Sequence, residues 1–203
     1  MMSAGTKRAL TIAAVTLLGL TLHPAPAIAH EAGGLADGFL SGLRHPISGL
    51  DHMLAMIAVG LWGAQLGAPA IWLLPVTFPL VMACGGVLGI RGVPLPAVEI
   101  GIAASAVLLG AAVLARWRPV LAGALVLVGA FAVCHGYAHG TERPDAANQL
   151  AYGAGFVLST GALHLTGIVV GLLQRWTWGA AAIRAAGAAI AATGLVLLVD
   201  VLR

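Results

Sequence analysis

The chain has 203 residues, of which 60% are hydrophobic and 8% charged, with a formal net charge of +3 and a mean hydropathy of +1.00. Soluble domains carry roughly 25% charged residues, so this composition excludes a water-soluble fold. The arginines are scattered and form no basic patch, so nucleic acid is not an expected partner. Gly- and Ala-rich apolar runs without the alternating pattern of a β-barrel predict an all-α, polytopic protein of the lipid bilayer.

Residues 1–29 have the three-part pattern of a secretory signal peptide. Lys7 and Arg8 precede an apolar run over residues 9–22, and small residues at 27 and 29 fit a cleavage site. An uncleaved anchor helix is the alternative. The short apolar run and the prolines that follow it favour the cleaved signal.

Residues 30–203 are then expected to form one membrane domain. Residues 30–43 are Gly-rich and weakly polar, which predicts a short external segment. Six apolar segments follow, each close to the roughly 17–25 residues that cross a ~30 Å hydrocarbon core. The predicted spans of this six-helix bundle cover residues 47–66, 70–90, 98–115, 120–139, 148–173 and 178–202.

A cleaved signal places the mature amino terminus on the periplasmic side of a bacterial inner membrane, and six spans return the carboxyl terminus to the same side. The distribution of arginines does not support this orientation by the positive-inside rule. Near the helix ends, the inside would hold Arg116, Arg118 and Arg175, and the outside Arg44, Arg91, Arg143 and Arg203. Because the loops carry so few charges, we base the orientation on the signal peptide.

Two polar motifs interrupt the apolar sequence. One runs from His45 to His52 as His-Pro-Ile-Ser-Gly-Leu-Asp-His, and the other from His135 to Glu142 as His-Gly-Tyr-Ala-His-Gly-Thr-Glu. Ionisable side chains at bilayer depth cost about 2.5–3.5 kcal/mol, so they usually mark a site or pathway. Imidazole and carboxylate together are ligands of transition metals. The first motif begins span one and the second ends span four, so both reach the same membrane face.

Spacing within the second motif suits a shared metal ion. His135 and His139 are four residues apart and therefore stand on one helix face, with Glu142 about a turn further along.

Spacing within the first motif is less direct. His45 and His52 lie about two turns, or ~10 Å, apart along a regular helix, too far for one ion. Pro46 suits a first helical turn and pushes His45 towards an extended conformation, so an irregular helix start would bring the two rings together. Asp51 is either a direct ligand or the hydrogen-bond partner that orients a histidine.

Three other residues are weaker candidates for the metal site. Glu99, at the external start of span three, either joins the site or faces lipid headgroups. His164 stands alone in span five, where a hydrogen bond between helices is the ordinary reason for a histidine and a transit role the alternative. Met56 offers a thioether sulfur, although methionine in a membrane helix is usually a packing residue.

These motifs closely resemble the HupE/UreJ family of bacterial membrane proteins, which are associated with nickel, sometimes cobalt, uptake for hydrogenase and urease maturation. The resemblance covers essentially the whole mature chain. Cys134 stands where the family commonly has Phe before the first histidine of the second motif, which places a thiol near the expected pathway. The resemblance implies that metal recognition belongs to six residues: His45, Asp51, His52, His135, His139 and Glu142.

The expected function is therefore a non-enzymatic permease that transports Ni²⁺ or Co²⁺ and holds no prosthetic group. A second copy of the chain, or a periplasmic or outer-membrane protein that delivers the metal, is a compatible partner. Alternatives are a membrane b-type cytochrome with haem between paired histidines, and a permease for copper or zinc, which bind the same ligands. An intramembrane metalloprotease is disfavoured, because the sequence contains no His-Glu-x-x-His.

Imidazole ligands predict a pH dependence of transport. Protons and metal ions compete for the same nitrogen, and the unperturbed pKa of imidazole is about 6.5. Metal uptake by cells that express the chain should therefore fall as the external pH drops below about 6.5. Uptake that stays flat from about pH 8 to about pH 5 would argue against imidazole ligands.

Overall fold

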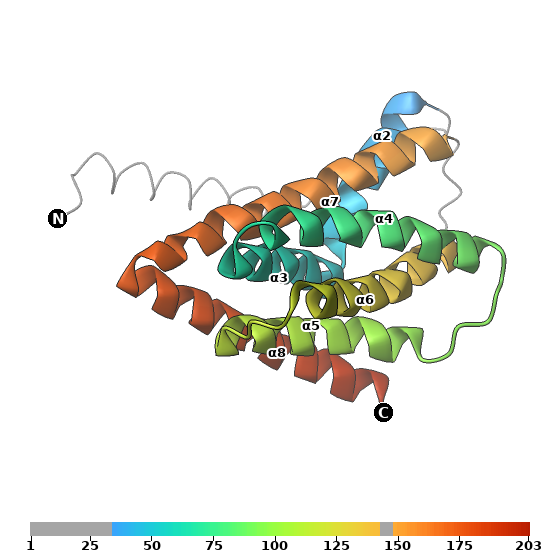
Figure 1. The fold of residues 1–203 in the computed structure, drawn as a ribbon. Helices are drawn as coiled ribbons and strands as arrows, with labels where there is room; N and C mark the ends of the chain where they lie inside the picture. Colours follow the sequence, from blue (N-terminus) through green and yellow to red (C-terminus); the bar gives the residue numbers. More distant parts are fainter. Residues whose placement is uncertain (1–33, 143–147) are drawn as a thin grey trace. The chain divides into compact units, whose positions relative to one another are not determined.

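The computed structural model describes residues 34–142 and 148–203, and this part of the chain is almost entirely helical, without strands (Figure 1). The predicted signal peptide, residues 1–29, lies outside the described residues. The all-α class is confirmed. The helices are α2 (Leu35–Ser48), α3 (Leu50–Leu66), α4 (Ala70–Ile90), α5 (Val98–Ala115), α6 (Leu121–Thr141), α7 (Gln149–Gly171), the 3-10 turn η1 (Leu172–Arg175) and α8 (Thr177–Val201).

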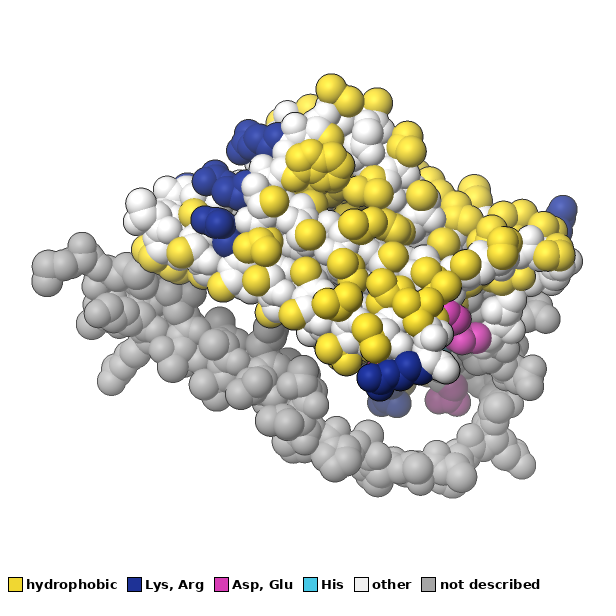
Figure 2. All heavy atoms as spheres, turned by 90° about the horizontal axis from the view of Figure 1, so that it is seen from below, with side chains coloured by type: hydrophobic (Ala, Val, Ile, Leu, Met, Phe, Trp, Pro, Cys, Tyr) yellow, Lys and Arg dark blue, Asp and Glu magenta, His cyan; other side chains and the backbone are white. Residues whose placement is uncertain are grey.

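Five of the described helices, α4 to α8, are long and apolar enough to cross a bilayer, with η1 continuing α7. α2 and α3 meet the same criterion together, but they are bent by 80° at a short break, which is the geometry of either a sixth, broken span or a re-entrant loop. Helices α4 to α8 begin and end within a turn of the expected bounds. Figure 2 shows hydrophobic side chains over most of one face, with basic side chains at its edges, as a lipid-facing surface requires.

The structure corrects the expectation for the segment before α3. Residues 35–48, most of them expected in a short external segment without a predicted helix, form helix α2, which packs on α7. Glycine lowers helix propensity, which explains the error, but at Gly42 it lets α2 approach the backbone carbonyl of Tyr152 closely.

The position of His45 is corrected as well. It lies in the last turn of α2, and Pro46 is inside that helix rather than at the start of the next one. The chain turns instead at Gly49, which is extended, with φ −92° and ψ 114°. A Cβ at Gly49 would lie 3.0 Å from Asp51 Oδ1 and 3.4 Å from His52 Nδ1. Glycine at this bend therefore leaves room for the Asp51–His52 pair.

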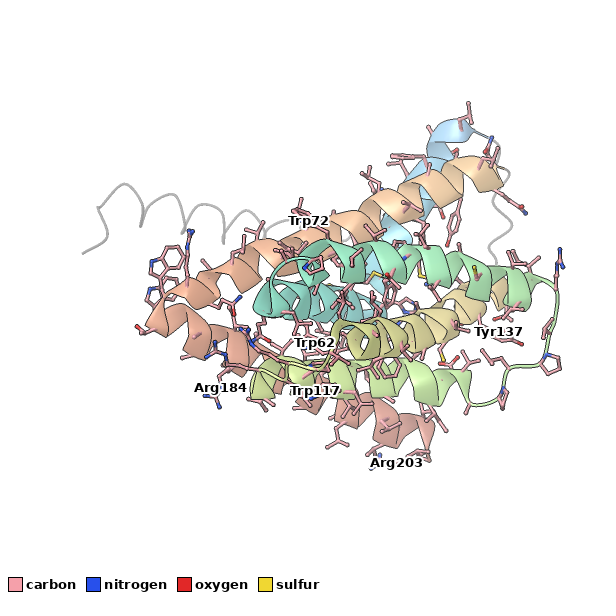
Figure 3. All side chains as sticks on the ribbon, viewed as in Figure 1. Trp62, Trp72, Trp117, Tyr137, Arg184 and Arg203 are labelled. Carbon is pink, nitrogen blue, oxygen red and sulfur yellow. The ribbon has the colours of Figure 1, made fainter. Side chains whose placement is uncertain are left out.

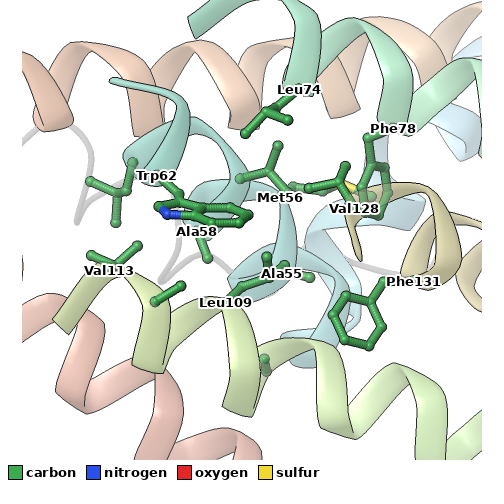
Figure 4. Packing of buried hydrophobic residues seen from close by; sticks show 14 of the residues in the cluster. Ala55, Met56, Ala58, Trp62, Leu74, Phe78, Leu109, Val113, Val128 and Phe131 are labelled. Carbon is green, nitrogen blue, oxygen red and sulfur yellow. The ribbon is translucent and has the colours of Figure 1, made fainter. Parts of the chain in front are cut away.

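Close helix pairs hold the bundle together, chiefly α4 with α6, α5 with α8, and α7 with both α2 and α3. Helix α3 is the most enclosed, and nearly all its residues from Ala55 to Gln65 are buried. Figure 4 shows this core, in which Met56 and Trp62 of α3 meet side chains of the surrounding helices. Small residues permit the close approach of α4 and α6, as at Gly136, where a Cβ would collide with the backbone carbonyl of Met82.

Gly136→Ala tests this close packing. Because the new methyl group meets backbone atoms, one helix must move, and overpacking of this kind costs about 1–3 kcal/mol. We expect a lower melting temperature for the purified full chain in lipid nanodiscs, measured by intrinsic fluorescence. Gly161→Ala is the control and should melt at the parental temperature or above it, since a Cβ there meets nothing within 4 Å and alanine favours the helix. Equal melting temperatures for the two variants would contradict the α4–α6 interface.

Candidate metal site

Four imidazoles from three helices lie ring against ring at one end of the bundle. His45 lies in the last turn of α2 and His52 in the first turn of α3, while His135 and His139 stand one turn apart on α6. The ring centroid of His52 lies 4.5 Å from that of His135 and 4.3 Å from that of His139. The centroid of His45 lies 4.8 Å from that of His139. The expected meeting of the two histidine motifs is confirmed.

Asp51 orients His52. Asp51 lies in the first turn of α3, where the helix dipole favours a carboxylate. Its Oδ1 accepts the backbone N–H of His52 at 2.8 Å and lies 3.1 Å from His52 Nδ1. An ionised carboxylate can only accept, so Nδ1 carries the proton and Nε2 presents a lone pair. Carboxylates hold metal-ligating histidines in this way.

The backbone orients His135 similarly. Its Nδ1 lies 2.9 Å from the carbonyl oxygen of Phe131, one turn earlier on α6. A carbonyl only accepts, so here too Nε2 presents a lone pair. His139 is paired differently, because its Nδ1 faces Nε2 of His45 at 3.0 Å and one of these two nitrogens donates to the other.

Three nitrogens in this cluster are buried without a hydrogen-bond partner: the Nε2 atoms of His52, His135 and His139. Leaving a buried polar atom unpaired costs about 1–3 kcal/mol. The lone pairs of His52 and His135 are satisfied only by a cation or a proton donor. The cluster thus has the chemistry of a binding site.

A cavity of about 220 Å³ opens beside these rings. His135 lies behind it, fully buried. Glu99 and Glu142 are exposed and line the cavity, so carboxylates extend from its mouth to the imidazoles. The described lining contains no Lys or Arg, so the local field attracts cations. The expected site residues that line it are His45, Asp51, His52, Glu99, His139 and Glu142.

The cluster is not a preformed coordination shell. Within residues 34–142 and 148–203, no three or more His, Cys, Asp or Glu side chains are arranged to hold a metal ion. His45 and His139 meet edge-on, with 69° between their ring planes, and direct nitrogens at each other. Their coordination of one ion therefore requires ring rotation, and the ligand role of the six residues stays a prediction.

The other sulfur and histidine candidates lie away from the cavity. Met56, one turn beyond His52, is fully buried in the hydrophobic core (Figure 4). Cys134 lies against Gly101 of α5 and does not line the cavity. His164 is buried on α7 outside the cavity.

Aromatic residues that the sequence did not single out enclose the imidazoles. Phe156 of α7 lies 4.7 Å from His139 between ring centroids, and Tyr152 lies 5.9 Å from His45. Phe78 of α4 lies 5.4 Å from His135. The four-residue spacing of Tyr152 and Phe156 places both on one face of α7, which is the one sequence signal for them.

The chain is similar to known proteins over most of its length. The family model described as HupE / UreJ protein matches residues 17–197. The Protein HupE of Rhizobium leguminosarum bv. viciae is 46% identical over 185 residues, which cover 91% of this chain and 95% of that protein. No solved structure matches the chain.

Asp51→Asn tests the role of the carboxylate. Asparagine still accepts a hydrogen bond but removes the charge that holds and polarises His52, so the dissociation constant for Ni²⁺ should rise about 10–100-fold. Equilibrium dialysis of the purified full chain in nanodiscs measures it. Asp200→Asn, which neutralises an exposed aspartate near Arg203, is the matched control and should bind as the parent does. Equal affinities for all three proteins would contradict the role of Asp51.

Proposed function

The chain belongs to the HupE/UreJ family of hydrogenase and urease accessory proteins, and we propose that it transports Ni²⁺, with Co²⁺ as the alternative cargo, into the cell. The metal would supply hydrogenase or urease maturation. The protein acts in this proposal as a multi-pass permease of the inner membrane, without enzymatic activity and without a prosthetic group. A second copy of the chain and a periplasmic metal-delivery protein are its candidate partners.

One observation carries this proposal: unpaired imidazole nitrogens are buried directly behind a cavity lined by carboxylates. The carboxylates attract a hydrated divalent cation, and the imidazoles then replace part of its water shell. Nitrogen and oxygen donors suit Ni²⁺ and Co²⁺, whereas a thiolate-rich cage would favour Zn²⁺ or Cu⁺. The described cavity lining contains no cysteine.

The incomplete coordination shell suits transport. A permeation site must bind well enough to capture an ion and weakly enough to release it. Because His45 and His139 pair with each other, the two rings have a resting arrangement to which they return when the ion leaves. When an ion binds, bonds to the metal replace the hydrogen bond between His45 and His139. The loss of that hydrogen bond lowers the net affinity for the ion and speeds its release.

The proposed orientation places the cavity on the periplasmic side, as the predicted signal peptide indicates. Figure 3 shows Arg184 towards the beginning of α8 and Arg203 just past its end, so α8 carries a basic residue towards each face of the membrane. Arg184 Nε donates to the carbonyl of Leu114 at 3.1 Å, and so adds a basic side chain to the end that holds Arg116, Arg118 and Arg175. By sequence, Arg44, Arg91, Arg143 and Arg203 belong to the other end, so each end has four arginines and the positive-inside rule does not decide the orientation.

A haem protein fits the cluster poorly. Axial histidines lie on opposite faces of the macrocycle, whereas these imidazoles contact each other directly, with centroids 4.3–4.8 Å apart. The cavity of about 220 Å³ is also smaller than the roughly 300–1,000 Å³ typical of organic ligand sites. Copper and zinc bind the same donors, so selectivity among metals is decided by experiment.

Radiolabelled Ni²⁺ uptake by cells expressing the full chain tests the proposed function. His52→Ala and His139→Ala should each abolish uptake, because each removes an unpaired nitrogen of the cluster. Leu54→Met, a volume-conserving change on the same helix as His52, should leave uptake unchanged. Unlabelled Co²⁺, Zn²⁺ and Cu²⁺ compete in parallel and rank the cargo.

Two results would contradict the proposal. If His52→Ala takes up Ni²⁺ at the parental rate, with both proteins at equal membrane abundance, the imidazole cluster takes no part in transport. If Zn²⁺ or Cu²⁺ inhibits Ni²⁺ uptake at lower concentrations than Co²⁺ does, and is itself taken up, then that ion rather than Ni²⁺ is the cargo.

A further inference from the structure

His164 is the one described histidine outside the four-imidazole cluster, and its burial is unexplained by packing alone. It lies on α7, is 2% exposed, and neither ring nitrogen has a hydrogen-bond partner. Thr160, one turn earlier on the same helix, is fully buried, and its hydroxyl oxygen also lacks a partner. The two side chains share a helix face because they are four residues apart.

Leaving these groups unpaired is costly. A neutral imidazole has one donor and one acceptor, and each costs about 1–3 kcal/mol when buried without a partner. An apolar side chain at this position would avoid that cost. The helices are also closely packed here, since a Cβ at Gly60 of α3 would collide with the His164 carbonyl. Two buried polar side chains one turn apart, with three polar atoms that lack a partner between them, indicate a ligand.

A single aromatic ring separates His164 from the cluster at the cavity. Phe78 of α4 lies edge-on to both imidazoles, with ring centroids 5.4 Å from His135 and 5.5 Å from His164. Phe78 is fully buried in the core of the bundle (Figure 4). The order His135, Phe78, His164 therefore leads from the back of the cavity into the interior.

The helix that carries Phe78 is locally weakened. Pro75 and Pro79 lie inside α4, on either side of Phe78. Pro79 has no N–H to donate to the carbonyl of Pro75, and proline at this position permits a kink. A small change at this kink displaces the Phe78 ring relative to the two imidazoles.

We propose that His164 and Thr160 form a second, deeper cation station, and that Phe78 is the movable partition between it and the cavity. This inference rests on the proposed transport function and adds a defined intermediate to it. The ion passes from His135 to His164 when the ring moves aside. The imidazole and the hydroxyl supply two ligands, and water retained by the ion completes its shell, so binding is weak enough for onward release.

A thiol placed at the station reports contact with the ion. In a background with Cys84→Ala and Cys134→Ala, His164→Cys offers a sulfur ligand, and Co²⁺ serves as the probe. The full chain in nanodiscs should then show thiolate-to-cobalt charge-transfer absorption. Leu163→Cys, one residue away on α7, is the control and should show none. This readout requires sulfur bound to metal, so a purely structural role of His164 would not produce it.

The outcomes separate this inference from the transport function itself. Absence of the absorption in His164→Cys, while dialysis shows Co²⁺ bound at the parental level, overturns the station and leaves the cavity site standing. Equal absorption in the two cysteine variants overturns it as well. If the parent protein binds neither Ni²⁺ nor Co²⁺ in dialysis, the proposed function fails and the station fails with it.

Transport kinetics test the same station in the native background. His164→Gln keeps a polar side chain of similar reach but removes the imidazole, so the maximal rate of Ni²⁺ uptake should fall about tenfold. The Co²⁺ affinity of the cavity should not change. Phe78→Leu removes the partition, so preloaded cells should lose Ni²⁺ faster. Leu163→Met is the control for both.

A parental maximal rate for His164→Gln would overturn the station. If preloaded cells with Phe78→Leu lose Ni²⁺ at the parental rate, Phe78 is not the partition between the two sites.

Discussion

Unpaired imidazole nitrogens inside a tightly packed membrane bundle are the constraint on which the account of this protein depends. In lipid, buried polar atoms find few alternative partners, so each unsatisfied nitrogen is a standing cost. The chain nevertheless places three of them together, at His52, His135 and His139. Asp51 and the Phe131 carbonyl use the other nitrogens of two of these rings, which leaves their Nε2 lone pairs free for a ligand. This arrangement of lone pairs is what the proposed cation site requires.

Small residues make the arrangement possible. The α4–α6 interface closes at Gly136, between the two histidines of α6, and the α3–α7 interface closes at Gly60, beside His164. Close backbone contact fixes the helices that carry the imidazoles, so the proposed coordination of an ion depends on rotation of the rings rather than on movement of the helices. This arrangement suits the proposed transport, because the scaffold would hold the donors near one another while the side chains exchange ligands.

The sequence predicted the parts of the structure that depend on hydropathy and on helix direction. Apolar runs of sufficient length located α4 to α8, and alternating helix direction placed the two histidine motifs on one face. It did not predict the bend at Gly49, because a Gly-Pro-rich stretch is equally compatible with a loop and with two short helices. Nor did it identify Phe78, Tyr152 and Phe156 beside the imidazoles, since contacts between distant helices depend on helix rotation, which hydropathy does not encode. The predicted position of His45 was wrong for the same reason: the stretch around Pro46 and Gly49 does not reveal that one helix ends and another begins there.

X-ray absorption of the Ni²⁺-loaded full chain in nanodiscs tests the central claim most directly, because it reports the atoms bound to the metal. We expect a first shell of nitrogen and oxygen near 2.1 Å, with the outer-shell scattering of at least two imidazoles and no sulfur. A shell that contains sulfur, or one of oxygen alone without imidazole scattering, would contradict it.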